Sequence, residues 1–401
     1  MSTLHIMLAS GENLPNLIPA ISSLPDDAQF KADKVLILTS TAMRKNAEVL
    51  QQGLLFAGIQ DVAIHDEDCP AHDLDLIHAC ANRRAEEIAL RYDGMRHVLN
   101  ITGGNKLMTV ALLLAFQEGN TEIVYCDTEN DRIEYVWGNK TKINLPVNVL
   151  KLETCLAAQG YALQENEATD VEGILSRAVL TRKLVASAPQ IQKLIYALNR
   201  TRFCTDRADE RNYLRTELEK PNPVEKDLLQ DMQSSGLLTS QMTYPDWVAD
   251  KYLRGGWLEE WCWIVGHELT KLASGEKLEK TRFAIGQKIV PLITDERREV
   301  NDKVTNELDA VYIHRNRMLL LECKTSAIDP QGMVSRLVAV GHNVGGRMND
   351  KWLLTSNLMS PIKLESVKKR AEENEVALIP AEELIYLQEK VYRWMMDSKT
   401  H

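Results

Sequence analysis

The segment that most constrains the fold is residues 306–324, which read NELDAVYIHRNRMLLLECK. Two short apolar runs, Ala310–Ile313 and Met318–Leu321, flank a polar turn near Arg315-Asn316. Apolar runs of this length on either side of a short turn predict a β-hairpin. Charged residues end both strands, although a buried strand face rarely tolerates them unless they are paired or bind a metal ion.

Three charged residues, Asp309, Glu322 and Lys324, lie at the open end of this hairpin. Side chains alternate along a strand, so Glu322 and Lys324 point to the same face. A two-residue turn would place Asp309 directly opposite Glu322, with about 5 Å between their Cβ atoms. Two carboxylates at that distance can hold one Mg²⁺ or Mn²⁺ ion, and the lysine could orient the attacking water or offset negative charge at phosphorus. The alternative is a salt-bridged hairpin end, with Lys324 between two surface carboxylates.

Helix and strand signals flank the hairpin in a regular order. Residues 257–274 have apolar side chains at helical spacing and predict an amphipathic helix. Glu259 and Glu260 lie in its first turn, where acids also simply complement the helix dipole, and we expect Glu259 to reach the hairpin. After the hairpin, Gly332–Val344 predicts a helix and Lys351–Thr355 predicts a strand. The predicted order of elements is therefore α-β-β-α-β.

Strand and helix signals alternate along the first 150 residues. Strands separated by helices favour a largely parallel α/β sheet of the Rossmann type, and the ligands of such sheets gather outside the carboxyl ends of the strands. The last two strands resemble an antiparallel hairpin. The predicted strands are His5–Ala9, Lys34–Thr39, Val62–Ile64, His97–Ile101, Glu122–Cys126 and Arg132–Val136, with helices at Leu14–Ser23, Thr41–Ala57, Asp75–Tyr92 and Leu107–Glu118.

Glycines, hydroxyls and a lysine occupy the turns at these strand ends. In Thr102-Gly103-Gly104-Asn105-Lys106, the paired glycines would let the backbone approach a ligand, and the N-terminus of the following helix favours phosphate. A tight βα turn without a ligand also explains the glycines, and Ser or Thr in a turn commonly caps a helix. Neither the P-loop motif nor the dinucleotide-binding glycine motif occurs in the chain. The candidate ligand-binding residues are Ser10, Thr39, Ser40, Thr102, Gly103, Gly104, Asn105 and Lys106.

Two short motifs resemble metal sites without completing them. His65-Asp66-Glu67-Asp68 begins like the motif of HD phosphohydrolases but lacks the further histidines, so we expect this acidic stretch to be solvated surface. His267-Glu268 begins like the zinc-protease motif H-E-x-x-H, but Lys271 stands at the position of the second histidine. Neither motif predicts a metal site.

The segment 151–245 differs in character from the parts on either side. Helices are predicted at Val171–Ala186, Gln190–Leu198 and Val224–Ser234, and Leu237–Tyr244 is expected to be extended. Small helices followed by a hairpin could form a winged-helix module. A plain helical connector is the other interpretation.

Composition excludes several classes of protein. A chain of 401 residues with 44% hydrophobic residues is globular and long enough for two or three domains. No apolar run approaches the roughly 18–20 residues that span a bilayer, and the N-terminus does not resemble a signal peptide. The seven cysteines are scattered without a C-x-x-C pair, which is typical of reduced thiols in a cytoplasmic protein. The net charge of −10 argues against a protein that coats nucleic acid non-specifically.

A strand-TGGNK-helix turn in a Rossmann-like domain, followed by a D…E-x-K hairpin, resembles one family of CRISPR-associated ancillary nucleases. In these proteins a CARF (CRISPR-associated Rossmann fold) sensor is fused to a PD-(D/E)XK, or restriction-endonuclease-like, domain. The resemblance covers residues 1–150 for the sensor and 246–401 for the nuclease. It implies a homodimer whose paired sensors bind cyclic oligoadenylate, with cyclic tetra-adenylate as the expected activator. Binding would switch on metal-dependent cleavage of DNA or RNA in type III CRISPR antiviral defence.

The resemblance also implies roles for individual residues. By position, Asp309, Glu322 and Lys324 match the catalytic triplet, Glu259 matches the acid on the preceding helix, and residues 103–106 match the ligand loop. The metal ligands implied are Asp309, Glu322, Glu259 and the main-chain carbonyl of Cys323, with Mg²⁺ or Mn²⁺ as the cation. Arg336 and Arg347 are candidates for contacts with the substrate backbone.

Two functions of other classes stay open at this point. One is a constitutive repair or restriction nuclease whose N-terminal domain binds no activator. The other is a nucleotide-responsive DNA-binding regulator that does not catalyse a reaction. A dehydrogenase is disfavoured because the glycine motif for a dinucleotide is missing.

Overall fold

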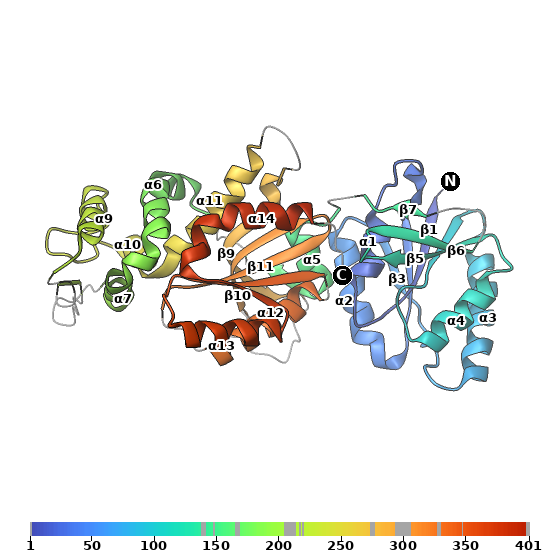
Figure 1. The fold of residues 1–401 in the computed structure, drawn as a ribbon. Helices are drawn as coiled ribbons and strands as arrows, with labels where there is room; N and C mark the ends of the chain where they lie inside the picture. Colours follow the sequence, from blue (N-terminus) through green and yellow to red (C-terminus); the bar gives the residue numbers. More distant parts are fainter. Residues whose placement is uncertain are drawn as a thin grey trace.

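The computed structural model describes residues 2–137, 142–146, 149–164, 169–203, 214–215, 218, 220–272, 277–292, 306–326, 330–346 and 348–397. They form an N-terminal domain, a C-terminal domain beside it, and a group of helices at the far end of the C-terminal domain (Figure 1). Arg347, a predicted substrate contact, lies outside these residues. None of the helices in the described ranges is long and apolar enough to cross a membrane.

The N-terminal domain is built on a sheet with helices on both faces. Its parallel strands run in the order β3-β2-β1-β4-β5, and the antiparallel strands β6 and β7 extend the sheet beyond β5. The arrangement confirms the predicted Rossmann-like fold. The strands are β1 (Thr3–Leu8), β2 (Lys34–Leu38), β3 (Asp61–Ile64), β4 (Arg96–Asn100), β5 (Thr121–Asp127), β6 (Arg132–Trp137) and β7 (Ile143–Asn144).

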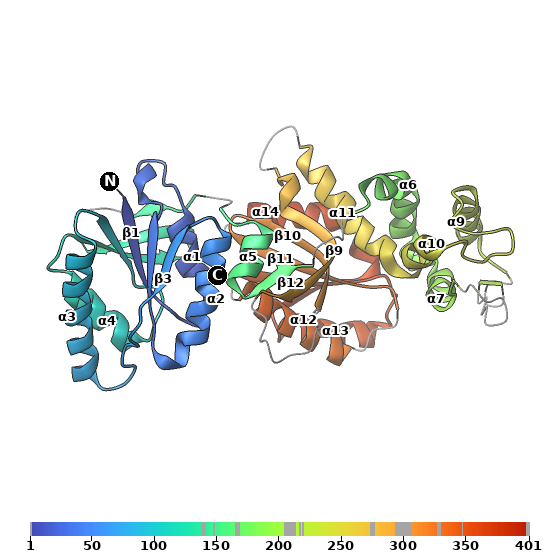
Figure 2. The same ribbon diagram turned by 180° about the vertical axis from the view of Figure 1, so that it is seen from behind.

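Alternate residues of β1 face the two layers of helices. Met7 belongs to the apolar cluster under α1 and α2, whereas Ile6 and Leu8 belong to the cluster under α3 and α4. Both faces of a parallel sheet are covered, so its strands are apolar throughout. In Figures 1 and 2, α1 and α2 lie toward the C-terminal domain, and α3 and α4 form the outer face. The helices are α1 (Leu14–Ile21), α2 (Arg44–Phe56), α3 (Leu74–Arg91) and α4 (Lys106–Phe116), with 3₁₀ turns at Ala28–Phe30 and Thr41–Met43.

The C-terminal domain is built on a second sheet, whose strands run in the order β13-β12-β11-β10-β9-β8. Each strand from β8 to β11 is antiparallel to the next, whereas β12 and β13 continue the sheet in parallel with β11. The strands are β8 (Tyr161–Leu163), β9 (Phe283–Pro291), β10 (Asn306–His314), β11 (Arg317–Lys324), β12 (Asn349–Thr355) and β13 (Val376–Ile379).

Helices cover both faces of this sheet as well. Tyr312 and Leu319 pack with α11 and α14, and their neighbours Val311 and Leu320 pack with α12 on the other face. The order along the chain is α11-β9-β10-β11-α12-β12, so the predicted α-β-β-α-β elements are present with one further strand, β9, between the helix and the hairpin. The helices are α11 (Trp257–Thr270), α12 (Pro330–Gly345), α13 (Pro361–Glu372) and α14 (Leu387–Met396), with 3₁₀ turns at Lys280–Arg282 and Ala381–Tyr386.

The hairpin has the predicted two-residue turn. Ile313 pairs with Met318 and Ala310 pairs with Leu321, so one further step in the same register sets Asp309 opposite Glu322. The turn residues Arg315 and Asn316 both have positive φ, 47° and 57°, as a type I′ turn requires. The side chain of Asn316 accepts hydrogen bonds from the main-chain N–H groups of Val149 (2.8 Å) and Leu150 (3.1 Å). The turn is therefore fastened to the segment that joins the two domains.

The chain enters the second sheet earlier than the sequence suggests. Helix α5 (Leu152–Ala158) packs on α2 of the N-terminal domain. Directly after it, β8 pairs with β9 at the edge of the C-terminal sheet. Part of the segment 151–245 that we assigned to a connector thus belongs to the second sheet. Helix α5 lies between the two domains (Figure 2).

The remainder of that segment is helical and does not lie between the domains. No strand occurs in its described residues beyond β8, and Leu237–Tyr244 is not a strand, so the wing of a winged-helix module is not present there. In Figures 1 and 2 these helices lie at the end of the C-terminal domain that is remote from the N-terminal domain. They are α6 (Val171–Ser187), α7 (Gln192–Arg200), α9 (Pro223–Ser234) and α10 (Trp247–Lys251), with a 3₁₀ turn at Ala188–Gln190 and a π-helical turn, η5, at Tyr252–Gly256.

Candidate active site and ligand turns

Asp309, Glu322 and Lys324 come together at the open end of the hairpin. The Nζ atom of Lys324 lies 2.6 Å from Oε1 of Glu322 and 3.3 Å from Oδ2 of Asp309. The same Oδ2 accepts a 2.8 Å hydrogen bond from the main-chain N–H of Cys323, whose carbonyl accepts a 3.1 Å bond from Lys324. The lysine does lie between two carboxylates, but Glu322 is buried and not at the surface.

Burial and mutual repulsion perturb the carboxyl groups of this cluster. Burial raises the pKa of Glu322, and the charge of Asp309 raises it further. Glu259 approaches the same cluster from α11, where burial and the charge of Asp309 raise its pKa to about 8. Burial would lower the pKa of Lys324, but the charges of Asp309 and Glu322 outweigh this effect and raise it. Several ionisable groups therefore share one poorly hydrated site.

Glu260 and Arg336 have different surroundings from Glu259. The Oε1 atom of Glu260 lies 2.6 Å from Nη2 of Arg177, which comes from α6. Glu259 is thus the acid of α11 that lies near the hairpin, and Glu260 joins α11 to the neighbouring helix. Arg336 is exposed on α12, where its positive charge slightly offsets the rise in the pKa of Glu322.

The donor set of the cluster suits a divalent cation. Among the described residues, no group of three or more His, Cys, Asp or Glu side chains is already arranged to hold a metal ion. However, Asp309, Glu322 and Glu259 supply the hard oxygen donors that Mg²⁺ and Mn²⁺ prefer. A bound cation would relieve the repulsion between these carboxylates. Lys324 pairs with two of them, while Lys251 and Arg336 act on Glu259 and Glu322 through their charges.

Residues from the helices beyond the C-terminal sheet hold the end of β11, and no local sequence signal identifies them. Thr325 directly follows Lys324. Its Oγ1 lies 3.0 Å from Oδ1 of Asn199 in α7 and 3.2 Å from the carbonyl oxygen of Arg254 in η5. The carbonyl of Thr325 also accepts a 2.9 Å hydrogen bond from the amide of Asn199. These contacts fix the position of the backbone that carries the lysine.

The glycine pair after β4 packs against the end of β1. A Cβ atom on Gly103 would collide with the carbonyl oxygen of Leu8, and Gly104 has a φ of +83°. Thr102 is occupied as well: its hydroxyl donates to Oδ1 of Asn100 at 2.6 Å and accepts from the N–H of Cys126 at 2.7 Å. The local packing therefore requires these three residues whether or not a ligand binds.

The remaining predicted ligand residues lie on the same edge of the sheet, because β2, β1 and β4 are neighbours. The hydroxyl of Ser10 donates to the carbonyl of Glu12 at 2.9 Å, and Thr39 and Ser40 are buried. Asn105 caps α4 by accepting from the N–H of Met108 at 2.9 Å. Lys106, the first residue of α4, is exposed.

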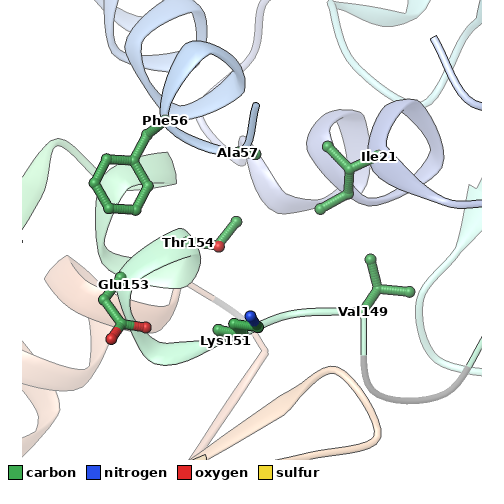
Figure 3. Close-up of a pocket in the computed structure, with 7 residues that line it drawn as sticks. All are labelled: Ile21, Phe56, Ala57, Val149, Lys151, Glu153 and Thr154. Atoms are coloured by element: carbon green, nitrogen blue, oxygen red, sulfur yellow. The ribbon is translucent and has the colours of Figure 1, made fainter. Parts of the chain in front are cut away.

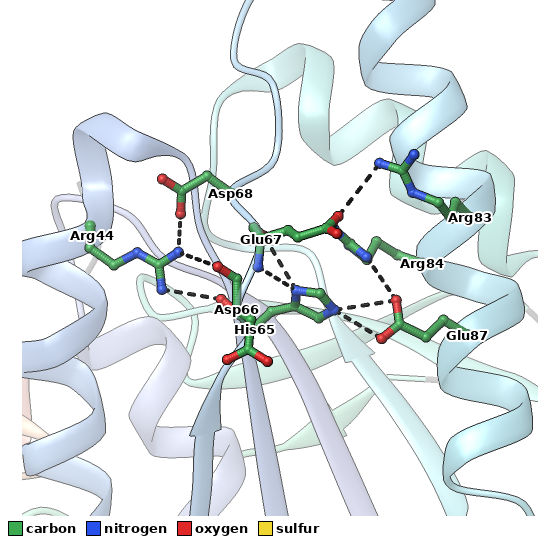
Figure 4. Close-up of polar contacts among 8 residues, drawn as sticks. All are labelled: Arg44, His65, Asp66, Glu67, Asp68, Arg83, Arg84 and Glu87. Atoms are coloured by element: carbon green, nitrogen blue, oxygen red, sulfur yellow. Dashed lines mark hydrogen bonds and ion pairs between the residues drawn. The ribbon is translucent and has the colours of Figure 1, made fainter.

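The loop that begins at His65 follows β3 directly. We expected this acidic stretch to be solvated surface, and that expectation was wrong for His65. His65 is only 7% exposed. Its Nδ1 accepts from the N–H of Glu67 at 3.1 Å, and its Nε2 lies 3.1 Å from Oε1 of Glu87 (Figure 4). Arg84 bridges Glu67 and Glu87 at 2.5 and 2.7 Å, and Arg44 binds the carbonyl of His65 at 3.1 Å. Ion pairs thus hold the loop against α3, and His65 is buried between them.

A cavity of about 500 Å³ lies at the opposite edge of the sheet, between the C-terminal ends of α1 and α2 and the segment that leads into α5 (Figure 3). Its lining includes neither the hairpin cluster nor the ligand turns. The lining residues are Ile21, Phe56, Ala57, Val149, Lys151, Glu153 and Thr154.

Solved structures with this fold cover almost the whole chain. Can2 from Sulfobacillus thermosulfidooxidans, in complex with cyclic tetra-adenylate, is 18% identical with a TM-score of 0.72, over 98% of this chain and 99% of that one. Protein VC1899 from Vibrio cholerae is 15% identical with a TM-score of 0.76, over 100% and 99%. A type III CRISPR defence DNA nuclease activated by cyclic oligoadenylate is 18% identical with a TM-score of 0.50, over 92% of this chain and 52% of that one.

Family models match both domains. The model of the Card1 CARF domain matches residues 4–154, and the model of the Card1-like endonuclease domain matches residues 246–398. No curated protein matches the chain. The two matched ranges contain the ligand turns and the hairpin cluster respectively. The chain therefore belongs to the family of CRISPR-associated nucleases in which a CARF domain is joined to a Card1-like endonuclease domain.

Proposed function

We propose that this protein is an endonuclease that hydrolyses phosphodiester bonds in DNA, RNA or both, with a divalent cation, when its CARF domain binds cyclic oligoadenylate. Cyclic tetra-adenylate is the proposed activator, and type III CRISPR antiviral defence is the proposed setting. The observation that carries the proposal is the cluster of partly buried Asp309 and Lys324 with buried Glu322 on a hairpin of the endonuclease domain. The predicted ligand turn at residues 102–106, on a separate sheet, supports the proposed response to an activator.

In the proposed reaction, water attacks phosphorus in line with the leaving oxygen. Asp309, Glu322, Glu259 and the carbonyl of Cys323 would hold Mg²⁺ or Mn²⁺, which would supply a Lewis acid for the phosphate and lower the pKa of bound water. Lys324 can orient the attacking water or offset the charge that develops on the phosphate. The ammonium of Lys324 already lies between the carboxylates of Asp309 and Glu322. It is therefore close to the place where a bound phosphate would bring further negative charge.

The ligand turns suit the phosphates of a cyclic oligonucleotide. Lys106 places an exposed positive charge at the first residue of α4, whose N-terminal N–H groups favour anions. The absence of a side chain on Gly103 and Gly104 keeps the backbone of the turn close to the sheet edge. Can2, which shares the fold, has been solved with cyclic tetra-adenylate.

A homodimer is part of the proposal, and the surface of α4 supports it. Leu107, Val110 and Leu114 are 47%, 50% and 41% exposed. Their spacing of three and four residues puts them on one face of the helix. This apolar stripe begins next to Lys106, so pairing two copies through α4 would bring two ligand turns together.

One helix extends from the ligand edge to the active site. The side chain of Glu12, in the turn after β1, lies beside Gly346, the residue after α12, where a Cβ atom on Gly346 would collide with the Glu12 carboxylate. Arg336, on the same helix, acts on Glu322 through its charge. With 16 residues, α12 is about 24 Å long. We infer that an activator bound beside Ser10 favours the active conformation of the catalytic site over the inactive one, and that α12 transmits this change.

Cleavage assays with purified full-length protein test the proposal. Labelled single-stranded DNA, plasmid DNA and RNA would be incubated with Mn²⁺, Mg²⁺ or EDTA, with and without cyclic tetra- and hexa-adenylate. We expect cleavage that needs both the cation and the tetra-adenylate ring and that is lost in Glu322→Gln. Equal cleavage without any ring would favour a constitutive nuclease, and binding of DNA without cleavage would favour a regulator.

A further inference from the structure

The helices at the far end of the molecule border the active site directly. Asn199 at the end of α7 and Arg254 in η5 both bond to Thr325, the residue after Lys324. The turn of the same hairpin is fastened to the segment between the domains, so its catalytic end points away from the CARF domain. A strand that leaves Lys324 on the side of Thr325 would therefore run toward α7 and η5, and α10 directly precedes η5 in the chain.

Aromatic side chains are exposed on this surface. Tyr196 of α7 is 52% exposed, and Trp247 of α10 is 65% exposed. The rings of Phe203 and Trp247 pack edge to face, with 5.1 Å between ring centres. Exposure of two large rings to water is unfavourable. A base that stacks on rings exposed to this extent would remove part of their surface from water.

Positive charge lies among these rings. The guanidinium of Arg200 lies over the ring of Tyr196, 5.1 Å from its centre. Arg202 is exposed two residues further on, where burial of part of its side chain and the charge of Arg254 lower its pKa. The carboxylate of Asp250 is buried and paired with Arg254 at 3.0 Å. An exposed acid, Asp246, begins α10.

We propose that α7 and α10 form a platform that binds an unpaired nucleic-acid strand next to the active site. Bases would stack on Tyr196 and Trp247, while Arg200 and Arg202 would contact the phosphates. Exposed aromatic rings next to arginines are the usual device for holding single strands without sequence preference. Paired bases cannot reach the rings, so this platform favours unpaired segments over duplex. The inference deepens the proposed function and rests on it for the position of the cleaved bond.

Binding can be measured without cleavage. Full-length Glu322→Gln protein with cyclic tetra-adenylate would be titrated into fluorescein-labelled oligodeoxythymidine and a labelled duplex of equal length, followed by fluorescence anisotropy. Tyr196→Ala and Trp247→Ala should each weaken binding of the single strand by about tenfold, with little effect on the duplex. Tyr196→Phe keeps the stacking ring and should bind as tightly as the parent protein.

Matched controls come from exposed residues elsewhere on the same domain. Tyr386 is 56% exposed, and Arg393 is an exposed arginine on α14. Tyr386→Ala and Arg393→Ala should leave binding unchanged, whereas Arg200→Ala should weaken it and reduce its salt dependence. If Tyr196→Ala and Trp247→Ala bind the single strand as tightly as Tyr386→Ala, the platform is wrong.

The platform and the nuclease activity can fail separately. In the protein with an intact Glu322, Tyr196→Ala and Trp247→Ala should raise KM for single strands and largely preserve kcat. Normal cleavage by these variants, with unchanged KM, overturns the platform and leaves the nuclease. Weakened binding in the variants, together with no cleavage by the unsubstituted protein, supports the platform and overturns the nuclease.

Discussion

Glu259 and Glu260 are neighbours in α11 but serve different parts of the molecule. Glu260 forms a buried ion pair with Arg177, at 2.6 Å. Glu259 lies near Asp309, and its pKa is raised to about 8 by burial and by that charge. We therefore expect the change from Glu to Gln to affect cleavage at position 259 and stability at position 260.

Glu259→Gln should reduce cleavage and leave folding intact, because it removes a carboxylate donor from the proposed cation site but keeps a polar side chain of the same size in the cluster. Glu260→Gln should lower the free energy of unfolding by about 1–3 kcal/mol, because the charge of Arg177 loses its partner in a partly buried site. Cleavage rates and thermal unfolding of both proteins check this. Equal loss of stability in the two variants would contradict the assignment.

Lys324→Met should lower cleavage by at least about 100-fold, because no other described side chain places a positive charge between Asp309 and Glu322. Binding of cyclic tetra-adenylate should stay unchanged, as measured by isothermal titration calorimetry. Lys390→Met is a suitable control, since Lys390 also forms an ion pair, 2.8 Å from Glu383, but lies on α14. A Lys324→Met protein that cleaves normally would remove the lysine from the mechanism.

Lys106→Ala should change the response to the ring, whereas Gly103→Ala should change the stability of the fold. Lys106 is exposed at the start of α4, so its loss should raise the concentration of ring needed for half-maximal cleavage and leave the melting temperature unchanged. Gly103→Ala should lower the melting temperature, because its Cβ collides with the main chain of Leu8. Activation curves and thermal melts of the two proteins test the prediction, and unchanged activation in Lys106→Ala would remove the lysine from the ligand site.

Glu12→Ala should bind the ring normally but show weaker stimulation of cleavage by it. Glu12 lies beside Gly346, so in the proposed coupling it links the ligand edge to α12. Ring affinity and the ratio of activated to basal cleavage would be measured separately. Glu48→Ala, an exposed substitution on α2, serves as the control. Unchanged stimulation in Glu12→Ala would show that the coupling runs elsewhere.

His5 should make the protein less stable in acid. It is fully buried in β1, and burial lowers its pKa from 6.5 to about 4 while its Nε2 donates to the carbonyl of Phe30 at 2.6 Å. Below pH 6.5 the unfolded chain binds a proton that the native histidine does not, so the free energy of unfolding should fall by up to about 1.4 kcal/mol per pH unit down to pH 4. Above pH 6.5 this contribution is constant.

His5→Gln keeps a donor for Phe30 but does not titrate in this range. Its unfolding free energy should therefore fall less steeply than that of the unsubstituted protein between pH 6.5 and 4. Chemical denaturation at several pH values gives both curves, and parallel curves would show that His5 contributes nothing to the acid sensitivity.

The hairpin and its register could be predicted from the chain alone. A two-residue turn at Arg315-Asn316 fixes which residues of the two strands pair. This pairing buries Val311 and Leu320 together and sets Asp309 opposite Glu322. The alternation of strands and helices in the first 150 residues likewise predicted the parallel sheet. Such features depend on residues a few positions apart, so their periodicity is visible in the chain.

Contacts between residues far apart in the chain could be read only from the folded molecule. The partner of Glu260 is 83 residues away, and Thr325 is held by Asn199 at a separation of 126 residues. The burial of His65, the entry of β8 into the second sheet and the place of α7 and η5 beside Thr325 also depend on residues far apart in the chain. Side-chain type limits which contacts are favourable, but the packing of whole helices and sheets decides which of them form.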